Sequence, residues 1–219
     1  MANLNISKNS FNKLIGMKDI YIANVIQNDN EGYKTDTPVK FAPALGAKIT
    51  AKVDTTELYG DDVIQQSSSS LTEVDIELDV ACLNLNQIAM LYGQKIDNNG
   101  VLVDNANDLG GSVAIGYRNK MSNGLYQFTW LYVCNFAGEA NTYQSIEGKI
   151  KGQDLTLKGT AIPRAKDNNW RARAQEGLLY ANGKTTPQDM LNTWFSAVVE
   201  PDFSNTPINN PASETPVQS

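Results

Sequence analysis

The carboxylates of Asp61 and Asp62, with Glu57 close by in the chain, are the side chains best placed by type and spacing to do chemistry. Glycoside hydrolysis uses such a pair, in which one carboxyl group acts as the acid and the other as nucleophile or base. The pair works only where its surroundings separate the two pKa values. The surrounding segment, 55–70, is polar and ends in a run of serines. We therefore expect a solvated loop, and a hydrolase is the third reading of the chain.

Other catalytic and metal-ligating residues are scarce. The sequence has no histidine, which removes the commonest general base and the commonest metal ligand. Cys82 and Cys134 each stand in an apolar run, and we expect buried free thiols rather than a disulfide, a zinc site or a nucleophile. Segments 28–32 and 97–100 resemble calcium loops, but the glycine comes too early and no closing glutamate follows, so we expect turns. These residues predict a protein that is not an enzyme and holds no cofactor or metal.

The most unusual local feature is a row of acidic residues at alternate positions: Glu73, Asp75, Glu77 and Asp79. The residues between them are apolar, and Lys48 and Lys52 alternate with apolar residues in the same way. A period of two is typical of strands with one dry face and one wet face. The acidic row is either an ordinary solvated face or a functional one.

The elements that must position these residues are mostly strands, so the expected fold is mainly β. The first strand has apolar residues on both faces and is predicted to be central, and the last two strands are predicted to pair with each other. The predicted strands are 17–27, 47–53, 74–80, 112–119, 125–137, 155–162 and 170–174. The fifth strand carries aromatic residues that we expect on one face: Tyr126, Phe128, Trp130, Tyr132 and Phe136.

Two helices are expected. The first covers 84–92, with Asn84 as its cap and Gly93 at its end. The second begins near Pro187, with Thr186 as its cap, and is amphipathic through Val199. We expect an N-terminal arm (1–14), one β domain (15–200) and a flexible, proline-rich tail (201–219).

Bulk properties limit the partners. A chain of 219 residues with a net charge of −6 is not expected to hold DNA by attraction to its phosphates. The first residues contain no apolar stretch of signal-peptide length, and no run is long enough to span a membrane. We expect synthesis in the cytoplasm and no membrane anchoring.

Several short pieces occur in an order that resembles one family. They are GMKDIY, LYGDD, the acidic alternating strand, SNG before WLY, and a closing WF, spread over Ile15 to Val199. In this order they resemble the major tail proteins of siphophages that infect Gram-positive bacteria. Because no single piece is a catalytic motif, the resemblance rests on collinearity. The first 14 residues and the proline-rich end depart from the usual pattern.

The resemblance implies a tail-tube subunit, a β-sandwich or barrel with a helix packed on its side, that forms six-membered rings stacked around a tape-measure protein. The implied partners are further copies of the chain, the tape-measure protein, the tail terminator, distal tail proteins, and DNA in transient passage. The implied location is the virion tail. If the wet faces of the lysine and acidic strands line the lumen, four acids against two lysines leave two excess negative charges (4 − 2 = 2). An acidic wall would let DNA pass without binding it.

The resemblance and the flexible segments together give three sets of candidate residues. The lumen set is Lys48, Lys52, Glu73, Asp75, Glu77 and Asp79. The inter-ring set, in the loop 55–70, is Thr55, Glu57, Tyr59, Asp61, Asp62, Gln65 and Ser68. Arg171 and Arg173, on one side of the last strand, are expected to contact a neighbouring subunit. The alternative function is a virion decoration or carbohydrate-binding β-sandwich that uses the aromatic strand 125–137 as a stacking platform.

Overall fold

The computed structural model describes residues 12–60, 63–136, 138, 155–178 and 185–202, and it is mainly β, as the sequence predicts. Nine strands of the described chain form one antiparallel sheet, and two short strands form a second. The large sheet contains β1 (Leu14–Asn28), β2 (Tyr33–Thr35), β3 (Val39–Lys40), β4 (Ala44–Gly60), β5 (Val63–Val80), β8 (Val113–Met121), β9 (Tyr126–Phe136), β10 (Leu155–Ile162) and β11 (Arg171–Gln175). The remaining elements are α1 (Leu85–Tyr92), β6 (Lys95–Ile96), β7 (Leu102–Val103) and α2 (Gln188–Asn192).

The strand order of the large sheet is β2-β1-β8-β9-β10-β5-β4, with β3 also beside β1 and β11 also beside β9. The expected pairing of the last two strands with each other is wrong. Both β10 and β11 pair with β9, one after the other along the same edge, since Ile162 is opposite Val133 and Arg171 is opposite Leu131. The chain between them leaves the sheet and turns back through Asn168, whose φ is 57°. The long strand β9 thus pairs along one edge with two shorter strands, β10 and β11.

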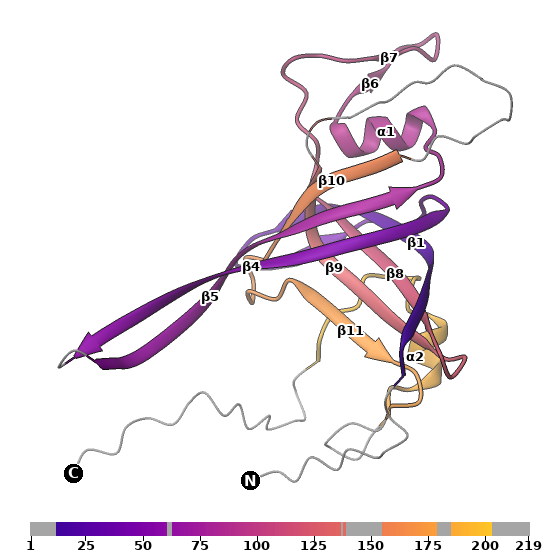
Figure 1. The fold of residues 1–219 in the computed structure, drawn as a ribbon. Helices are drawn as coiled ribbons and strands as arrows, with labels where there is room; N and C mark the ends of the chain where they lie inside the picture. The colour runs from indigo at the N-terminus through magenta and orange to yellow at the C-terminus, as the bar shows by residue number, and fades with distance from the viewer. Residues whose placement is uncertain (1–11, 61–62, 137, 139–154, 179–184, 203–219) are drawn as a thin grey trace, which may run out of the picture.

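Two hydrophobic cores lie on opposite faces of this sheet. On β1, Ile20 and Ile22 belong to the first core and Ala23 to the second, so the prediction of a strand covered on both faces is confirmed. The first core also contains the apolar row of β5 and the end of α1 (Figure 1). The second core lies under the C-terminal segment.

The helix α1 is capped as the sequence predicts. The side chain of Asn84 accepts a hydrogen bond from the backbone of Gln87, the side chain of Gln87 accepts one from the backbone of Asn84, and Gly93 ends the helix with φ of 71°. Leu91 and Tyr92 are buried in the first core. Local capping therefore fixes both ends, and the apolar stripe fixes the face that packs on the sheet.

A bulge in β9 divides the predicted aromatic face. Val113 is opposite Cys134 and Ile115 is opposite Leu131, so β9 carries one more residue than β8 in this interval. The extra residue reverses the alternation. Phe128, Trp130 and Tyr132 therefore lie in the second core, whereas Phe136 lies in the first. The expectation that Phe136 shares a face with the others is wrong.

The C-terminal helix is shorter than predicted. The helix α2 begins after Pro187, which is its N-cap in place of Thr186, and it ends at Asn192. Thr193 donates from its hydroxyl to the carbonyl of Asp189, and the carbonyl of Trp194 accepts a hydrogen bond from the indole of Trp130 (3.1 Å) instead of continuing the helix. We call residues 187–200 the C-terminal strap. Its apolar stripe is still buried, through Leu191, Trp194 and Val198.

The two cysteines have different surroundings. Cys134 is buried, and burial raises the pKa of its thiol. Cys82 is exposed, contrary to expectation. It follows the end of β5 at Val80, so the chain has already left the covered part of the sheet. Both are free thiols.

Gly116 of β8 gives a test of this packing. A Cβ built there would lie 2.7 Å from the ring of Trp130, which is fully buried. We expect Gly116→Ala to lower the free energy of unfolding by about 1 to 3 kcal/mol, because a packed ring cannot yield without strain. Urea unfolding measures this. Gly111→Ala, where nothing lies within 4 Å of the new carbon, is the matched control, and equal stability of the two variants would contradict the packing described.

Candidate assembly interface

The segment 55–70, expected to be a loop, is a continuation of two strands. β4 and β5 remain paired from Ala44 opposite Val80 to Gly60 opposite Val63, so only Asp61 and Asp62 separate them. Backbone hydrogen bonds between the two facing strands hold this segment in an extended conformation. Its Thr and Ser side chains are compatible with a solvent-exposed strand, although such a polar sequence is also typical of a loop. The prediction of a loop is therefore wrong for 55–60 and 63–70.

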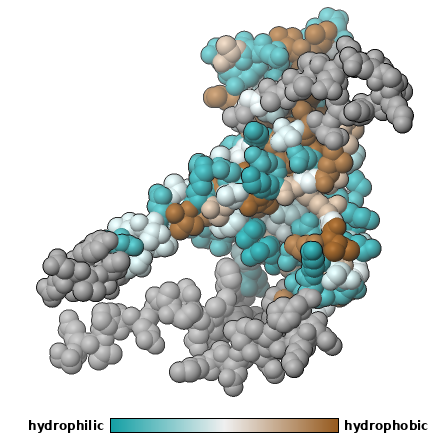
Figure 2. Space-filling model, in the orientation of Figure 1, coloured by the Kyte–Doolittle hydropathy of each residue, from teal (hydrophilic) through white to brown (hydrophobic). Residues whose placement is uncertain are grey.

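This extension projects from the body of the molecule, and we call residues 54–72 the projecting hairpin (Figure 1). Residues 54–57 and 67–70 are exposed, and the coloured part of the arm in the space-filling view is mostly hydrophilic to intermediate (Figure 2). Thr55 and Ser69 share a hydrogen bond across the strands (3.2 Å). Of the other inter-ring candidates, Glu57 and Ser68 are exposed on this arm, Tyr59 and Gln65 belong to its strands, and Asp61 and Asp62 lie outside the described residues.

The predicted lumen residues do come together on one face of β4 and β5. Lys52 forms ion pairs with Glu73 (2.6 Å) and Asp75 (2.8 Å), and Lys48 forms one with Glu77 (3.4 Å). Hydrogen bonds from Lys52 to Asp75 and to Glu73 raise the pKa of Lys52. Such exposed pairs contribute little to stability, so the face stays wet and charged.

Two residues that sequence reasoning missed complete this charged face. Lys158 of β10 is directly opposite Glu77 and therefore on the same side of the sheet. Asp54 follows Lys52 by two positions and accepts a hydrogen bond from Thr72 (3.1 Å). The charged face thus consists of Lys48, Lys52, Asp54, Glu73, Asp75, Glu77, Asp79 and Lys158. Five carboxylates against three lysines leave two excess negative charges (5 − 3 = 2). The alternation in 155–162 was the available signal for Lys158.

The opposite face of β4 and β5 is covered unequally. The apolar row of β5 is buried in the first core, as predicted. On β4, Ala44 and Ile49 pack against that core, whereas Ala47 and Ala51 are exposed and Val53 is 52% exposed. The reason is position, because β4 is the last strand of the sheet order and its outer edge has no strand partner in the described part of the chain. An edge of 17 residues with exposed apolar side chains is a surface that proteins normally cover.

Arg171 and Arg173 lie on β11, away from the charged face. Arg171 is half-buried, with its guanidinium 4.1 Å from the centre of the Trp170 ring, and Arg173 is exposed. Both are on the sheet face opposite Ala172 and Ala174, which pack toward the second core. The structure thus places the two arginines together, as predicted, and separates them from the acidic strand.

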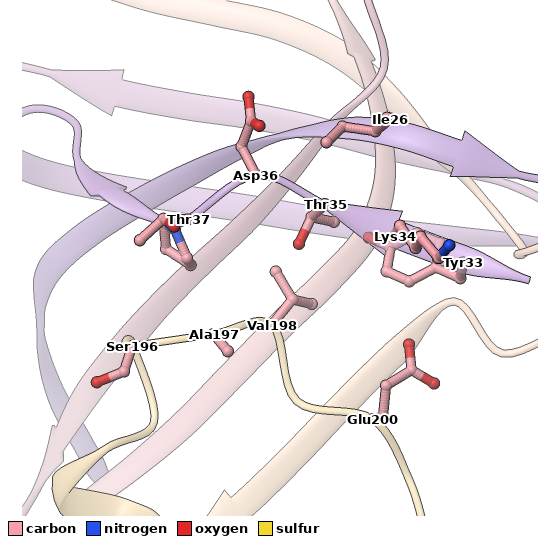
Figure 3. Close-up of a pocket in the computed structure, with 11 residues that line it drawn as sticks. Ile26, Tyr33, Lys34, Thr35, Asp36, Thr37, Ser196, Ala197, Val198 and Glu200 are labelled. Carbon is pink, nitrogen blue, oxygen red and sulfur yellow. The ribbon is translucent and has the colours of Figure 1, made fainter.

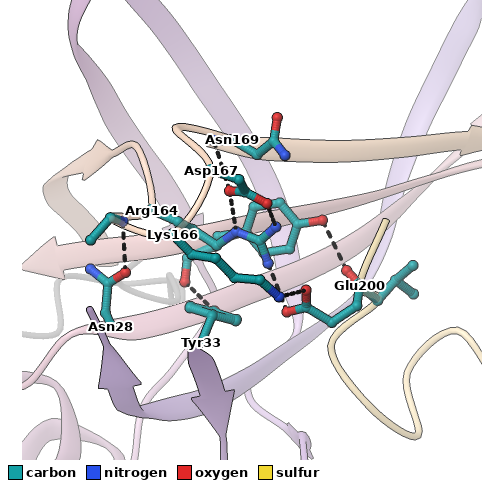
Figure 4. A network of polar contacts seen from close by, with 10 residues as sticks. Asn28, Tyr33, Arg164, Lys166, Asp167, Asn169 and Glu200 are labelled. Atoms are coloured by element: carbon teal, nitrogen blue, oxygen red, sulfur yellow. Dashed lines mark hydrogen bonds and ion pairs between the residues drawn. The ribbon is translucent and has the colours of Figure 1, made fainter. Parts of the chain in front are cut away.

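A polar cluster missed by sequence reasoning holds the C-terminal strap (Figure 4). The side chain of Arg164 is fully buried and binds Asp167 and Glu200, the latter at 2.7 Å. Its guanidinium lies 4.0 Å from the ring centre of Tyr132, whose hydroxyl donates to the carbonyl of Val199 (2.9 Å). The cluster therefore ties the strap to the sheet through charge, aromatic contact and backbone hydrogen bonding.

We expect Arg164→Met to lower the free energy of unfolding by about 2 kcal/mol. Removing one partner of a buried ion pair costs about 3 to 5 kcal/mol, but the Asp167 and Glu200 side chains are 27% and 43% exposed and can rehydrate. Lys166→Met, which removes only an exposed ion pair to Glu200, is the control, with an expected change below about 1 kcal/mol. Unfolding followed by tryptophan fluorescence, which reports on Trp194 of the strap, measures both. An equal decrease in the free energy of unfolding for the two variants would contradict the role of Arg164 in holding the strap.

Two clefts beside the C-terminal strap contain no catalytic arrangement among the described residues. One cleft of about 350 Å³ lies between the 33–38 segment and residues 196–200 of the strap (Figure 3). Its two described carboxylates are already engaged, since Asp36 accepts from Asn24 (2.9 Å) and Glu200 binds Arg164. The cleft is thus a groove beside the strap whose described carboxylates both have partners within the chain.

A larger cleft, of about 740 Å³, lies between the β8–β9 hairpin, β1 and the strap, and is lined in part by Asp19, Lys40 and Arg118. Asp19 has a φ of 52° within a bulge of β1. Its carboxylate oxygens bind Lys40 (3.0 Å) and Arg118 (2.7 Å). Burial alone would raise the pKa of Asp19, but these two cations lower it below its usual value. An ionised carboxylate with both oxygens engaged is a structural ion pair, not a general base.

The two calcium-like segments are turns, as predicted. Asp29 accepts from the backbone N–H of Glu31 and Gly32, and Asp97 accepts from those of Asn99 and Val101. Within the described ranges, no three cysteine or acidic side chains are grouped to hold a metal ion. Nor is either helix of the described chain long and apolar enough to cross a membrane.

Most of the predicted N-terminal arm (1–11 of 1–14) and of the C-terminal tail (203–219 of 201–219) lies outside the described residues. No model of a known protein family and no curated protein matches this sequence.

Proposed function

We propose that this chain is the structural subunit of a non-contractile bacteriophage tail tube. Copies of the chain form six-membered rings, the rings stack around a tape-measure protein, and the resulting tube conducts DNA. The subunit catalyses no reaction. Its other partners are the tail terminator and the distal tail proteins, and its place is the virion tail after synthesis in the host cytoplasm.

The observation that carries the proposal is the projecting hairpin. Its described side chains at 54–57 and 67–70 are exposed and belong to neither core, yet its two strands stay paired to Gly60 and Val63. A long two-stranded arm is only marginally stable in water, and a surface of this kind gains stability when it packs on another molecule. A repeating assembly of identical subunits supplies that molecule at every position.

The exposed edge of β4 is a second observation that supports the same proposal. Its apolar row is partly uncovered, with Val53 52% exposed, and its outer edge has no partner strand among the described residues. A neighbouring subunit can continue the sheet and cover the row, which removes the risk of indiscriminate aggregation. Lateral contact through this edge would build the ring, and the hairpin would then connect successive rings.

The charged face suits the wall of a DNA channel. Its two excess negative charges per subunit repel phosphate, and two of its three lysines, Lys48 and Lys52, are held in ion pairs with Glu73, Asp75 and Glu77. Free lysines would bind the DNA backbone through release of counterions and would slow its passage. A wall of paired charges with a small negative excess keeps water at the surface and gives DNA nowhere to bind.

The alternative, a decoration or carbohydrate-binding protein, depends on an accessible aromatic platform. Trp130 and Tyr132 are 0% and 1% exposed, and Phe128 is 5% exposed, because the C-terminal strap covers them. Stacking on a sugar ring needs an open face of the aromatic ring. The aromatic strand is therefore core in this structure, which removes the observation that motivated the alternative.

Negative-stain electron microscopy and analytical ultracentrifugation of the purified chain at rising concentration test the proposal. We expect rings or hollow tubes, either from the chain alone or after addition of tape-measure protein. Binding to a glycan array by a strictly monomeric protein that forms neither rings nor tubes under both conditions would support the decoration reading instead.

A further inference from the structure

Arg171 and Arg173 occupy a sheet face on which the described residues offer them no acidic partner. Both point to the same side of β11, since side chains alternate along a strand. Neither guanidinium lies within ion-pair distance of a carboxylate of the described residues. This differs from Arg118 and Arg164, which both bind carboxylates.

The neighbours of the two arginines on this face are known from the strand register. Three rows cross β8, β9 and β11: Ile115, Leu131 and Arg171; Tyr117, Thr129 and Arg173; Asn119, Gln127 and Gln175. The other seven positions are apolar, aromatic or uncharged polar. The two arginines therefore form an isolated basic site at the end of the first core.

The surroundings of this site favour binding of an anion. Arg171 is half-buried against Trp170, and both burial and the charge of Arg173 lower the pKa of Arg171. A carboxylate that binds between two like charges, one of them partly desolvated, stabilises both of them. The planar guanidinium also favours carboxylate oxygens in a fixed orientation.

We propose that the arginine pair binds the acidic end of the projecting hairpin from a second copy of this chain. The sequence of the projecting hairpin, 54–72, contains four acidic residues, Asp54, Glu57, Asp61 and Asp62, and no lysine or arginine. Their charge is complementary to that of the arginine site. The charged face is a poorer partner, because Glu73, Asp75 and Glu77 already form ion pairs with Lys48 or Lys52.

The contact joins different subunits. The projecting hairpin extends away from the body that contains β11 (Figure 1), so it is directed toward a neighbour and not toward the arginine pair of its own chain. A contact between two different surfaces of identical subunits does not form a symmetric dimer. Such a head-to-tail contact can repeat from subunit to subunit along a filament. This inference rests on the proposed function and names the surface that receives the hairpin.

Charge reversal tests the pairing. We expect Arg171→Glu with Arg173→Glu to raise the protein concentration needed for rings or tubes by about 30-fold or more, the effect of leaving interfacial charges unpaired. Asp61→Lys with Asp62→Lys should do the same. The chain carrying all four changes should assemble at a concentration within about threefold of the unchanged chain, since the attraction is restored with reversed sign. Sedimentation velocity and electron microscopy are the readouts.

The matched control is Lys34→Glu with Lys95→Glu, which reverses two exposed lysines outside the arginine site. Normal assembly of the Arg171 and Arg173 variant, or failure of the fourfold variant to recover while its circular dichroism stays unchanged, would overturn the pairing alone. If the unchanged chain stays monomeric at every concentration, with and without tape-measure protein, the proposed function fails and the pairing fails with it. If the Arg171 and Arg173 variant assembles normally but its assemblies no longer retain DNA, the arginines bind phosphate. That result also contradicts the pairing.

Discussion

Replacing residues 55–69 with Asn-Gly should leave a folded domain that no longer forms tubes. Asp54 and Ser70 are opposite each other in the hairpin, so a two-residue turn of this type can join them without changing the register. The described side chains removed, at 55–57 and 67–69, are exposed and belong to neither core. Circular dichroism should show the same fold, with a melting temperature within about 4 °C of the unchanged chain, while electron microscopy should show no stacked rings.

A control for this truncation is Thr56→Ser with Ser68→Thr, which exchanges two facing residues of the hairpin and keeps its length. This variant should form tubes at the normal concentration. Tubes from the truncated chain would mean that the projecting hairpin is dispensable for stacking. Loss of the fold itself would mean that the hairpin stabilises the domain within one chain.

The second large effect concerns the charged face. Glu73→Lys with Glu77→Lys converts two excess negative charges per subunit into two excess positive charges, and the lysines at 48 and 52 lose carboxylate partners. The fold should persist, because exposed ion pairs contribute at most about 1 kcal/mol each. We expect tubes that retain duplex DNA at least tenfold more strongly than normal tubes, with retention that falls steeply as salt rises. Co-sedimentation of tubes with DNA at increasing salt measures this.

Glu31→Lys with Asp104→Lys is the control, since both residues are exposed and lie outside the charged face. It makes the same change in net charge. Equal DNA retention by the two variants would show that net charge, and not this face, decides the interaction. In that case the wall of the channel would have to be formed by another surface.

Several features of this protein follow from short-range rules and were predictable from sequence. The alternation in 74–80 identifies the buried row of β5, and Asn84 and Gly93 fix the ends of α1. Ser122 to Gly124 makes the predicted turn between β8 and β9, with Gly124 at φ of 88°. These rules act over a few residues, so the local sequence contains all that they need.

The candidate surfaces depended on contacts between distant segments. The polar sequence of 55–70 indicates a loop, but backbone pairing with a facing strand extends it into the projecting hairpin. Lys158 joins the charged face only because β10 lies beside β5. The isolation of Arg171 and Arg173 likewise follows from the pairing of β11 with β9, which surrounds them with uncharged positions.

Local sequence patterns were sufficient to predict a mainly β fold, the capping of α1, the dry and wet faces of β5 and the excess of acidic residues along it. Contacts between distant segments set which sheet edge has no strand partner in the described chain, where the bulge of β9 reverses the alternation, and how Arg164 holds the C-terminal strap over the aromatic strand. The physical reason is that side-chain alternation and capping are properties of neighbouring residues. Strand order, edge exposure and buried ion pairs depend instead on which distant segments compete successfully for the same backbone and the same surface.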